Sequence, residues 1–222
     1  MNTKYILPII PIRQPEMSAE CGIACSSMIA NYYQMQLDYD AIKASIGLYK
    51  WGTTTPQLGL FFLENGYDVE IIGCHPALFY KDSVFDSTDD MLQHLKNMRQ
   101  ILKDDTDKIA LEHFINYIKA GGTMQIRIPT AADIDTAIAL NTPVLVPVSH
   151  WFMHKNDMPP RYSIHFNVVY GSDNECFYVC DPDFGEPFYG QHRIDKQTFM
   201  YACYVSCKGG IDDGCVMIVR RK

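Results

Sequence analysis

The chain has 222 residues, of which 47% are hydrophobic and 12% aromatic, so it can bury one sizeable core without metals or disulfides. Its net charge of -7 argues against nucleic acid or an anionic membrane as a partner, because both require an excess of Lys and Arg. No apolar run approaches the roughly 20 residues of a membrane span. We therefore expect one domain over residues 1–222, and its negative charge accommodates a neutral or cationic substrate more easily than an anionic one.

The first residues contain one Lys and an apolar stretch broken by proline, without a small-residue cleavage site, which predicts no signal peptide and a cytoplasmic location. Eight cysteines in a chain of this length favour free thiols over a disulfide framework. The pairs Cys176/Cys180 and Cys203/Cys207 do not indicate zinc. Residues four apart on a strand are separated by about 13 Å, and no pair of histidines accompanies them. We expect no metal and no cofactor.

The N-terminal third is predicted to be mainly helical. An apolar stripe at helical spacing predicts a first helix over residues 21–33, with Ser18 as its N-cap. Asp40 is expected to cap a short helix that stops at Gly47. Thr55 and Pro56 open a third helix, which ends at 65–66, and residues 68–72 form a strand.

Residues 75–122 contain two charged amphipathic helices, expected over 90–102 and 108–119. After a strand at 124–128, Thr130 and Asp133 resemble the capping box of a helix that ends near Asn141. The remainder is predicted to be rich in strands, with one helix. The strands are expected at 143–148, 163–170, 176–180 and 215–219, and the helix at 196–204. Helices followed by a largely antiparallel sheet predict an α+β fold with a cleft between the two halves.

Cys21 lies at the start of the first predicted helix. Unpaired backbone N–H groups and the positive end of the helix dipole stabilise a thiolate there, and such sites lower a thiol pKa from about 8.5 to roughly 3.5–7.5. Cys21 is therefore a candidate nucleophile. The alternative interpretation is a small buried hydrophobe, which is the commoner role of an isolated cysteine.

A cysteine nucleophile requires a base and a group that orients the base. His165 lies early in one predicted strand and Asp181 at the end of the next, so a hairpin would bring both to the same edge of the sheet. His165 could also be a core histidine, and an Asp before Pro often only closes a strand. The weaker alternatives are His150 and His154 as the base, and Asp183 and Asn167 as the orienting group.

The segment between the strand at 143–148 and that of His165 is long and aromatic. Trp151 and Phe152 could form a rim of the cleft and contact a peptide. Alternatively, Trp151 fills the core and the rest of the segment is solvated.

Five motifs together carry a family resemblance. They are Gln14 followed by Cys21-Gly22-x-Ala24-Cys25-x-x-Met28; the segment from Gly52 to Leu58; Pro143-Val-Leu-Val; His165-Phe-x-Val-Val-x-Gly171; and Val179-x-Asp181-Pro182. The chain resembles the papain-fold cysteine peptidases that process bacteriocins with a double-glycine leader, and their stand-alone relatives. The resemblance covers residues 8–74 and 123–220 and implies a bacterial enzyme with a nucleophile helix packed on a C-terminal sheet.

The resemblance implies a role for each of four residues. Cys21 would be the nucleophile, His165 and Asp181 would complete a triad, and Gln14 would donate to the oxyanion. Three features depart from the family. Glu20 stands where Asp is usual, the Gln-to-Cys separation is one residue longer, and residues 75–122 form a helical insertion. Family members that process exported peptides are fused to a membrane transporter. This sequence contains no counterpart of that transporter.

These observations predict a cysteine peptidase or amidase that cleaves a peptide or protein substrate through a thioester acyl-enzyme. An acyltransferase or transpeptidase would use the same intermediate. An inactive peptide-binding domain would bind peptides in the same cleft without reacting. Labelling of Cys21 with an active-site-directed electrophile would distinguish an enzyme from such a domain. The sequence leaves the substrate, the pathway and the oligomeric state open.

Overall fold

The computed structural model describes residues 4–80, 83–153, 164–183, 189–208 and 210–222. Within these residues the chain folds around one sheet with the strand order β3-β2-β8-β4-β5-β6-β7, and β1 pairs with β5. Neighbouring strands are antiparallel except for β2 and β3. The strands are β1 (Tyr5–Ile6), β2 (Tyr67–Gly73), β3 (Thr123–Ile126), β4 (Val144–Ser149), β5 (Ile164–Ser172), β6 (Cys176–Cys180), β7 (Gln191–Asp195) and β8 (Cys215–Arg221).

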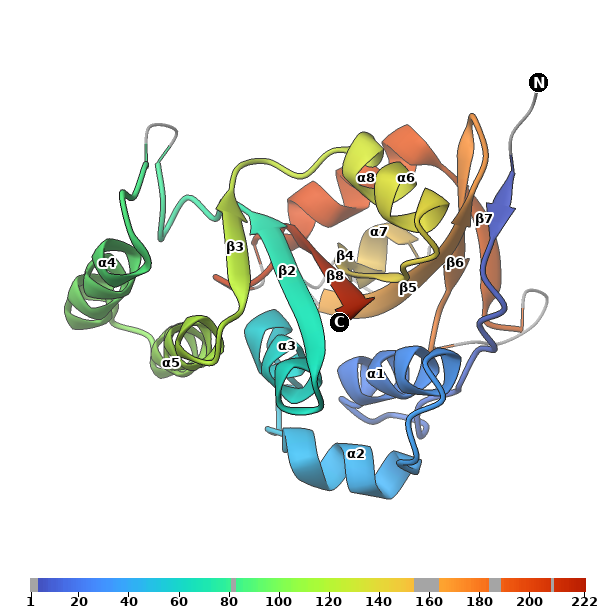
Figure 1. The fold of residues 1–222 in the computed structure, drawn as a ribbon, viewed down its shortest axis with the longest axis horizontal. Helices are drawn as coiled ribbons and strands as arrows, with labels where there is room; N and C mark the ends of the chain where they lie inside the picture. The colour runs from blue at the N-terminus through green and yellow to red at the C-terminus, as the bar shows by residue number, and fades with distance from the viewer. Residues whose placement is uncertain (1–3, 81–82, 154–163, 184–188, 209) are drawn as a thin grey trace.

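Helices cover both faces of the sheet. They are α1 (Cys21–Tyr32), α2 (Tyr39–Ile46), α3 (Thr55–Glu64), α4 (Thr88–Ile101), α5 (Asp105–Lys119), α6 (Ala131–Ala139), α7 (His150–Met153) and α8 (Lys196–Ser206). Figure 1 shows α1, α2 and α3 on one side of the sheet and α6 and α8 on the other. Helix α1, which begins with Cys21, packs on β5, and the predicted α+β class with a largely antiparallel sheet is confirmed.

The register brings the ends of β2, β4 and β6 and the starts of β5 and β8 to one edge of the sheet. Cys215, where β8 begins, pairs with Gly73, where β2 ends. The end of β4 pairs with the start of β5, so that Val148 faces His165. Residues that follow β2, precede β8, begin β5 or follow β6 therefore lie along this edge, which we call the catalytic edge.

Helix α1 is buried on almost all sides, since every residue from 22 to 30 is inaccessible to solvent. The sequence predicted that one apolar stripe of this helix would be buried, whereas the buried surface extends around most of the helix. Ser18 is not the N-cap: that position is Glu20, and the Ser18 hydroxyl only accepts a 3.4 Å bond from the Glu20 N–H. The packing of its surroundings, rather than a side-chain cap, holds the start of the helix.

Two further local expectations need correction. The N-cap of α2 is Asp38, whose carboxylate accepts the Ala41 N–H at 2.8 Å, and not Asp40, which lies within the first turn. The short elements β1, β7 and α7 were not expected. In contrast, Thr54 and Gln57 form a capping box at the start of α3, and the Asp133 carboxylate accepts the Thr130 N–H at 2.7 Å at the start of α6.

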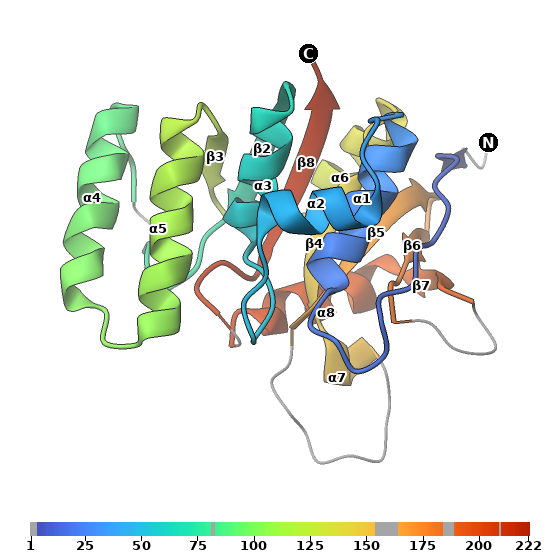
Figure 2. The same ribbon diagram turned by 90° about the horizontal axis from the view of Figure 1, so that it is seen from below.

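The two helices of the predicted insertion differ in burial. Six residues of α5 are buried, and α5 packs on α3, whereas α4 buries only Leu92 and Leu95. Figure 2 shows α5 between α4 and the sheet, with α4 outermost. Tyr117 of α5 is fully buried, and its hydroxyl lies 2.8 Å from both the Val69 and the Thr123 carbonyl oxygens, which share its one proton. Helix α5 is consequently part of the core.

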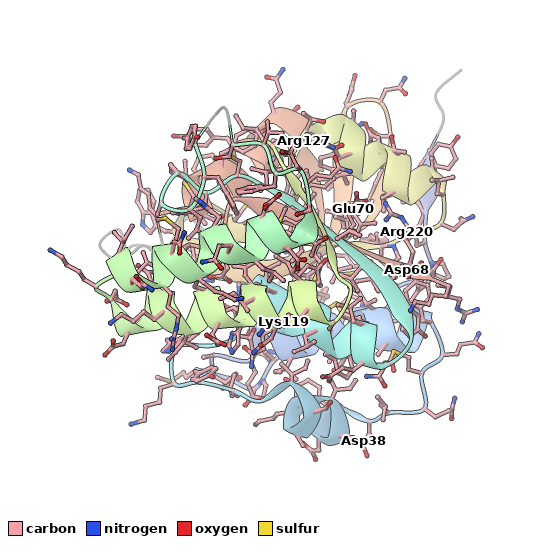
Figure 3. All side chains as sticks on the ribbon, turned by 60° about the vertical axis from the view of Figure 1, so that its left-hand side comes forward. Asp38, Asp68, Glu70, Lys119, Arg127 and Arg220 are labelled. Carbon is pink, nitrogen blue, oxygen red and sulfur yellow. The ribbon has the colours of Figure 1, made fainter. Side chains whose placement is uncertain are left out.

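Charged side chains mark the solvent-facing side of β2 and β8. Glu70 and Arg220 lie on these neighbouring strands and form a 2.7 Å ion pair (Figure 3). Arg127, also labelled there, forms two hydrogen bonds with Asp133, of 2.6 and 2.8 Å. None of the helices in the described ranges is both long and apolar enough to cross a membrane.

Candidate active site

Cys21 is the first residue of α1 and is partly buried. Burial alone would raise the pKa of its thiol. A hydrogen bond and the charge of His165, with backbone hydrogen bonds from Phe166 and Gly22, outweigh burial, so the Cys21 pKa lies below its ordinary value. Cys25, one turn further along α1, differs: its thiol donates to the Phe166 carbonyl at 3.1 Å, and burial raises its pKa.

His165 is the second residue of β5 and is only 4% exposed. Its Nε2 lies 2.6 Å from Oδ1 of Asp181, the residue after β6. Burial would lower the pKa of the imidazole, but Asp181 and Cys21 both stabilise its charged form and raise the pKa to about 10. Since Nε2 is bound to Asp181, Nδ1 is the ring nitrogen left to interact with the Cys21 thiol.

The Asp181 carboxylate is fixed from several sides. It is 1% exposed, and its Oδ1 also accepts the Asp183 N–H at 2.8 Å. The Asp181 N–H donates to the Gly190 carbonyl at 2.8 Å, so the segment before β7 holds its backbone. His192 of β7 approaches the other carboxylate oxygen, with Nε2 3.9 Å from Oδ2.

Sequence reasoning missed His192. The available signal was weak, because β7 has five residues, of which Ile194 is the one apolar residue, and its alternation of exposed and half-buried positions does not show in the sequence. Only the pairing of β7 with β6, which places His192 opposite Val179, brings the imidazole to the carboxylate.

The weaker sequence alternatives fall into three groups. His150 pairs with Asp183, Nε2 to Oδ2, at 3.2 Å, and its ring lies edge-on to that of His165 with centroids 5.0 Å apart. This second pair borders the first. Asn167 is fully buried, and its amide donates to the Phe166 carbonyl at 3.0 Å. His154 lies outside the described residues.

Gln14 lies beside the segment that carries Asp181. Its backbone N–H donates to the Pro182 carbonyl at 2.9 Å. The side-chain Nε2 donates to the Ser18 carbonyl at 3.4 Å, a long bond, and its buried Oε1 has no hydrogen-bond partner. The extra residue between Gln14 and Cys21 is thus accommodated within a loop that folds back on the amide.

Glu20, which replaces the usual Asp before the nucleophile, anchors α2 to the start of α1. Its carboxylate accepts from Lys43 Nζ at 2.8 Å and from the Tyr39 hydroxyl at 3.1 Å, and the residue is 6% exposed. The longer side chain therefore has a structural role beside Cys21.

The aromatic segment before β5 begins with α7. Trp151 is 41% exposed and Phe152 39%, so the interpretation that Trp151 fills the core is wrong. Both side chains lie at the catalytic edge, because α7 directly follows β4. A rim role for them stays a prediction.

The site contains an ionisable thiol at a helix start, a buried imidazole that it contacts, and a buried carboxylate on the far ring nitrogen. Such an arrangement can generate a thiolate at neutral pH and return a proton to a leaving group. All eight cysteines are free thiols, and across the described ranges no cluster of three or more His, Cys, Asp or Glu is placed to hold a metal. A thiol and an imidazole with a third, orienting group are also the combination found in papain-like cysteine peptidases.

Residues 10–85 match the model of the Peptidase C39 family. A double-glycine-motif protease from an AMS/PCAT transporter, solved in complex with its leader peptide, is similar over 100% of this chain and 99% of its own, with a TM-score of 0.50 and 12% identity. The predicted resemblance to this peptidase family and its papain-like fold is confirmed.

Two other solved structures are similar over nearly their whole length. The peptidase domain of Streptococcus ComA, a bi-functional ABC transporter, is 16% identical with a TM-score of 0.48, over 96% of this chain and 98% of that one. A C39-like peptidase from Bacillus anthracis is 14% identical, with a TM-score of 0.48, over 99% of each chain. No curated protein matches the sequence significantly.

Proposed function

We propose that the protein is a cysteine peptidase or amidase that uses Cys21 as nucleophile, His165 as general base and acid, and Asp181 as the group that orients the imidazole. The observation that carries this proposal is the continuous contact from the thiol through the imidazole to the carboxylate. The family resemblance supports peptide-bond chemistry.

In the proposed reaction the Cys21 thiolate attacks the carbonyl carbon of a peptide or amide bond. The carbonyl oxygen becomes an oxyanion, stabilised by the backbone N–H of Cys21 and by the side chain of Gln14. His165 then donates its Nδ1 proton to the leaving amine, the C–N bond breaks, and a thioester remains. Gln14 has to exchange its long bond to Ser18 for the oxyanion, so it is the donor that requires rearrangement.

The second half of the reaction consumes the thioester. Neutral His165 takes a proton from water, the hydroxyl attacks the thioester carbon, and the C–S bond breaks to release the acid and regenerate the thiol. If an amine attacks instead, the product is a new amide. Hydrolysis and acyl transfer therefore share every residue of the site and differ only in the acceptor.

The first experiment measures which cysteine reacts. The intact protein is treated with limiting iodoacetamide near neutral pH, and modified positions are quantified by peptide mass spectrometry. We expect Cys21 to be alkylated fastest and Cys25 slowly, because their pKa values are shifted in opposite directions. Equal labelling of several cysteines that His165→Ala leaves unchanged would contradict the proposed triad.

The second experiment ranks the residues by their effect on turnover. Cys21→Ala and His165→Ala should abolish it almost completely, and Asp181→Ala should be milder than His165→Ala. Gln14→Ala should cost roughly 100- to 1,000-fold in kcat, the usual loss for one oxyanion donor. If Gln14→Ala leaves kcat untouched, another group donates to the oxyanion. The substrate is identified by trapping: mass spectrometry of the acyl group on Cys21 after incubation with a peptide library.

Two alternatives use the same cleft. An acyltransferase would release amide-linked products when amines are added, whereas a hydrolase releases the free acid. A peptide-binding domain without activity would bind the library but carry no acyl group on Cys21. The leader peptide bound to the neighbouring protease supports a peptide as the partner in each case.

We also retain the interpretation of residues 1–222 as one domain with a helical insertion at 75–122, and a cytoplasmic location predicted from the sequence. The shared core supports the first of these, since buried residues of α5 and of α1 belong to one hydrophobic cluster.

A further inference from the structure

A cavity of about 270 Å³ opens at the catalytic edge, between the ends of β2 and α8 and the turn before β8. Pro76, Ile128, Pro129 and Tyr204 supply apolar walls, and Asp213 supplies a carboxyl group. Tyr204 is held in place because its hydroxyl donates to the Pro129 carbonyl at 2.8 Å. The cavity therefore combines fixed apolar walls with one acidic group.

The carboxyl group of Asp213 is unusual for its burial. Asp213 is only 5% exposed, and it lines the cavity. Its neighbour Asp212 is 7% exposed and accepts the Thr55 N–H at 2.8 Å, at the start of α3. Buried carboxylates are normally paired, so a buried carboxyl group that lines a cavity suits a cationic ligand.

The cavity is near the thiol. Asp213 and Cys21 are close enough for a negative charge on Cys21 to contribute to the raised pKa of Asp213. The connection also runs through the chain, since Thr55 binds Asp212 and Thr53 packs directly against Gly22. A peptide that presents its carbonyl to Cys21 can therefore place another of its side chains in the cavity, because each residue spans about 3.3–3.6 Å.

We propose that this cavity binds a basic side chain, arginine or lysine, of the peptide substrate, with its charged head on Asp213. The inference rests on the proposed function, because it assigns a specificity pocket to the same cleft.

The dimensions and the walls fit such a side chain. Pockets for drug-sized ligands measure roughly 300–1,000 Å³, so this smaller space suits one side chain. The methylene stem of Arg or Lys packs on Pro76 and Ile128 while its head reaches the carboxylate, as long basic side chains commonly do. The Tyr204 ring offers a face for the cation. The net charge of -7 attracts cationic peptides to the surface.

The electrostatics of the empty cavity agree with this assignment. Burial, followed by the neighbouring Asp212, raises the pKa of Asp213 well above its ordinary value. An entering cation would offset that cost and restore the carboxylate. A neutral or acidic side chain offers no such compensation.

The first test uses peptidyl vinyl sulfones that alkylate Cys21. Three matched sets carry arginine, citrulline or norleucine at one of the four positions before the warhead. At one position we expect arginine to react about 10- to 100-fold faster than citrulline, the range of a charge-assisted hydrogen bond. Asp213→Asn should remove this preference and leave the norleucine rate unchanged. Asp105→Asn, which changes the net charge equally at an exposed site, should retain it.

Equal rates for arginine and citrulline at all four positions in the wild-type protein would overturn the proposal without any variant, so a folding defect of Asp213→Asn cannot protect it. The proposal is also overturned if circular dichroism shows that Asp213→Asn is folded and the variant still prefers arginine to citrulline.

The second test does not depend on the thiol. N-acetyl-arginine amide is titrated into Cys21→Ala and into Cys21→Ala/Asp213→Asn, with N-acetyl-citrulline amide as the control, and binding is followed by NMR shifts of residues around the cavity. We expect shifts only for the arginine ligand and only with Asp213 present. If iodoacetamide fails to select Cys21 but this binding is observed, the proposed function is wrong and the cavity assignment stands. Absence of arginine-specific shifts here refutes the cavity.

Discussion

At the scale of single residues, the site couples two opposite pKa shifts. Burial opposes both shifts, but a hydrogen bond and the charge of His165 lower the Cys21 pKa, while Asp181 first and then Cys21 raise the His165 pKa to about 10. These shifts favour the coexistence of the thiolate and the imidazolium. Asp181 supports the pair from the far side of the ring, at 2.6 Å from Nε2.

The first prediction concerns the dependence of Cys21 alkylation and turnover on pH. Alkylation requires the thiolate, so its rate should already be at its plateau at pH values where an ordinary thiol, with a pKa of about 8.5, is protonated. Turnover also requires the His165 proton for the leaving amine, so it should fall as the pH rises through about 10. Stopped-flow alkylation and steady-state kcat/KM over pH 4–11 measure both limbs.

Asp181→Asn provides the matched control for this profile. The variant removes the largest favourable contribution to the His165 charge, so the alkaline limb of turnover should move to lower pH and the acid limb of alkylation to higher pH. A pH profile that is identical in the variant would show that Asp181 does not control the imidazole.

At the scale of elements, the start of α1 depends on a close contact with the segment before α3. Gly22 packs so tightly that a side-chain methyl there would collide with Thr53 Oγ1 and press on Leu58 and Phe166. With Thr53 in place, glycine after Cys21 lets α1 come this close to α3 and β5. The position of Cys21 relative to His165 is set by this packing.

We predict that Gly22→Ala strongly reduces Cys21 alkylation and lowers the free energy of unfolding by about 1–3 kcal/mol, the usual cost of overpacking. Urea denaturation and iodoacetamide kinetics measure the two effects. Thr53→Ala removes the colliding oxygen, which has no hydrogen-bond partner, so Gly22→Ala/Thr53→Ala should recover most of both losses. If the double variant does not recover stability and alkylation, a contact other than that with Thr53 makes glycine necessary at position 22.

A second element-scale prediction concerns α4. Because this helix buries only two residues and packs on α5, replacing residues 86–103 with a short Gly/Ser linker should leave a folded protein with a lower melting temperature and normal Cys21 alkylation. Circular dichroism and iodoacetamide kinetics on one variant test this. Extending the deletion through α5 should unfold the protein, since α5 contributes Leu111, Phe114 and Tyr117 to the core. Whether α4 also selects substrates, as a lid or side wall, is measured by turnover of the natural substrate.

The sequence predicted long periodic elements well and short ones poorly. Helices such as α1 and α5 bury several residues at helical spacing, which the sequence displays directly. Strand β1 spans two residues, and α7 four, too few to show a period. Which of Asp38 and Asp40 caps α2 depends on backbone angles that both residue types tolerate.

The same limit applies to the site. His165 and Asp181 could be placed at one edge because the strand period and a short turn fix their relation. Asp213 could not, because adjacent Asp residues before a glycine resemble an ordinary solvated turn. Its burial arises from α8 and β2, which are distant in the sequence.

At the scale of the whole molecule, Tyr117 joins three layers. Its ring packs against Gly59 of α3 and Gly122, and its hydroxyl binds carbonyls of β2 and β3. The side chain of Tyr117 therefore connects α5 with α3 and with strands β2 and β3.

We predict that Tyr117→Phe lowers the free energy of unfolding by about 1 kcal/mol, the usual contribution of one hydrogen bond, because the Val69 and Thr123 carbonyls lose the single hydroxyl proton that they share. Urea denaturation with an unchanged slope is the measurement. The exposed Tyr80→Phe is the control and should change stability by less than about 0.5 kcal/mol. Equal effects of the two substitutions would deny Tyr117 this role.

Strand β4 contains Pro147, which has no N–H to give to a neighbour, and its pairing with β8 is confined to Val144 and Leu145. On its other side β4 pairs with β5 along its whole length, and β8 pairs with β2 likewise. The sheet thus consists of two halves, one with β2, β3 and β8 and the other with β4, β5, β6 and β7, which meet at the short pairing of β4 with β8. His165 and Asp181 belong to the half of the sheet that contains β4, β5 and β6, and the Asp213 cavity borders the half that contains β2 and β8. Under the proposed function, the reacting groups and the pocket for a substrate side chain therefore lie in different halves, and a shift of one half against the other would change the distance between them.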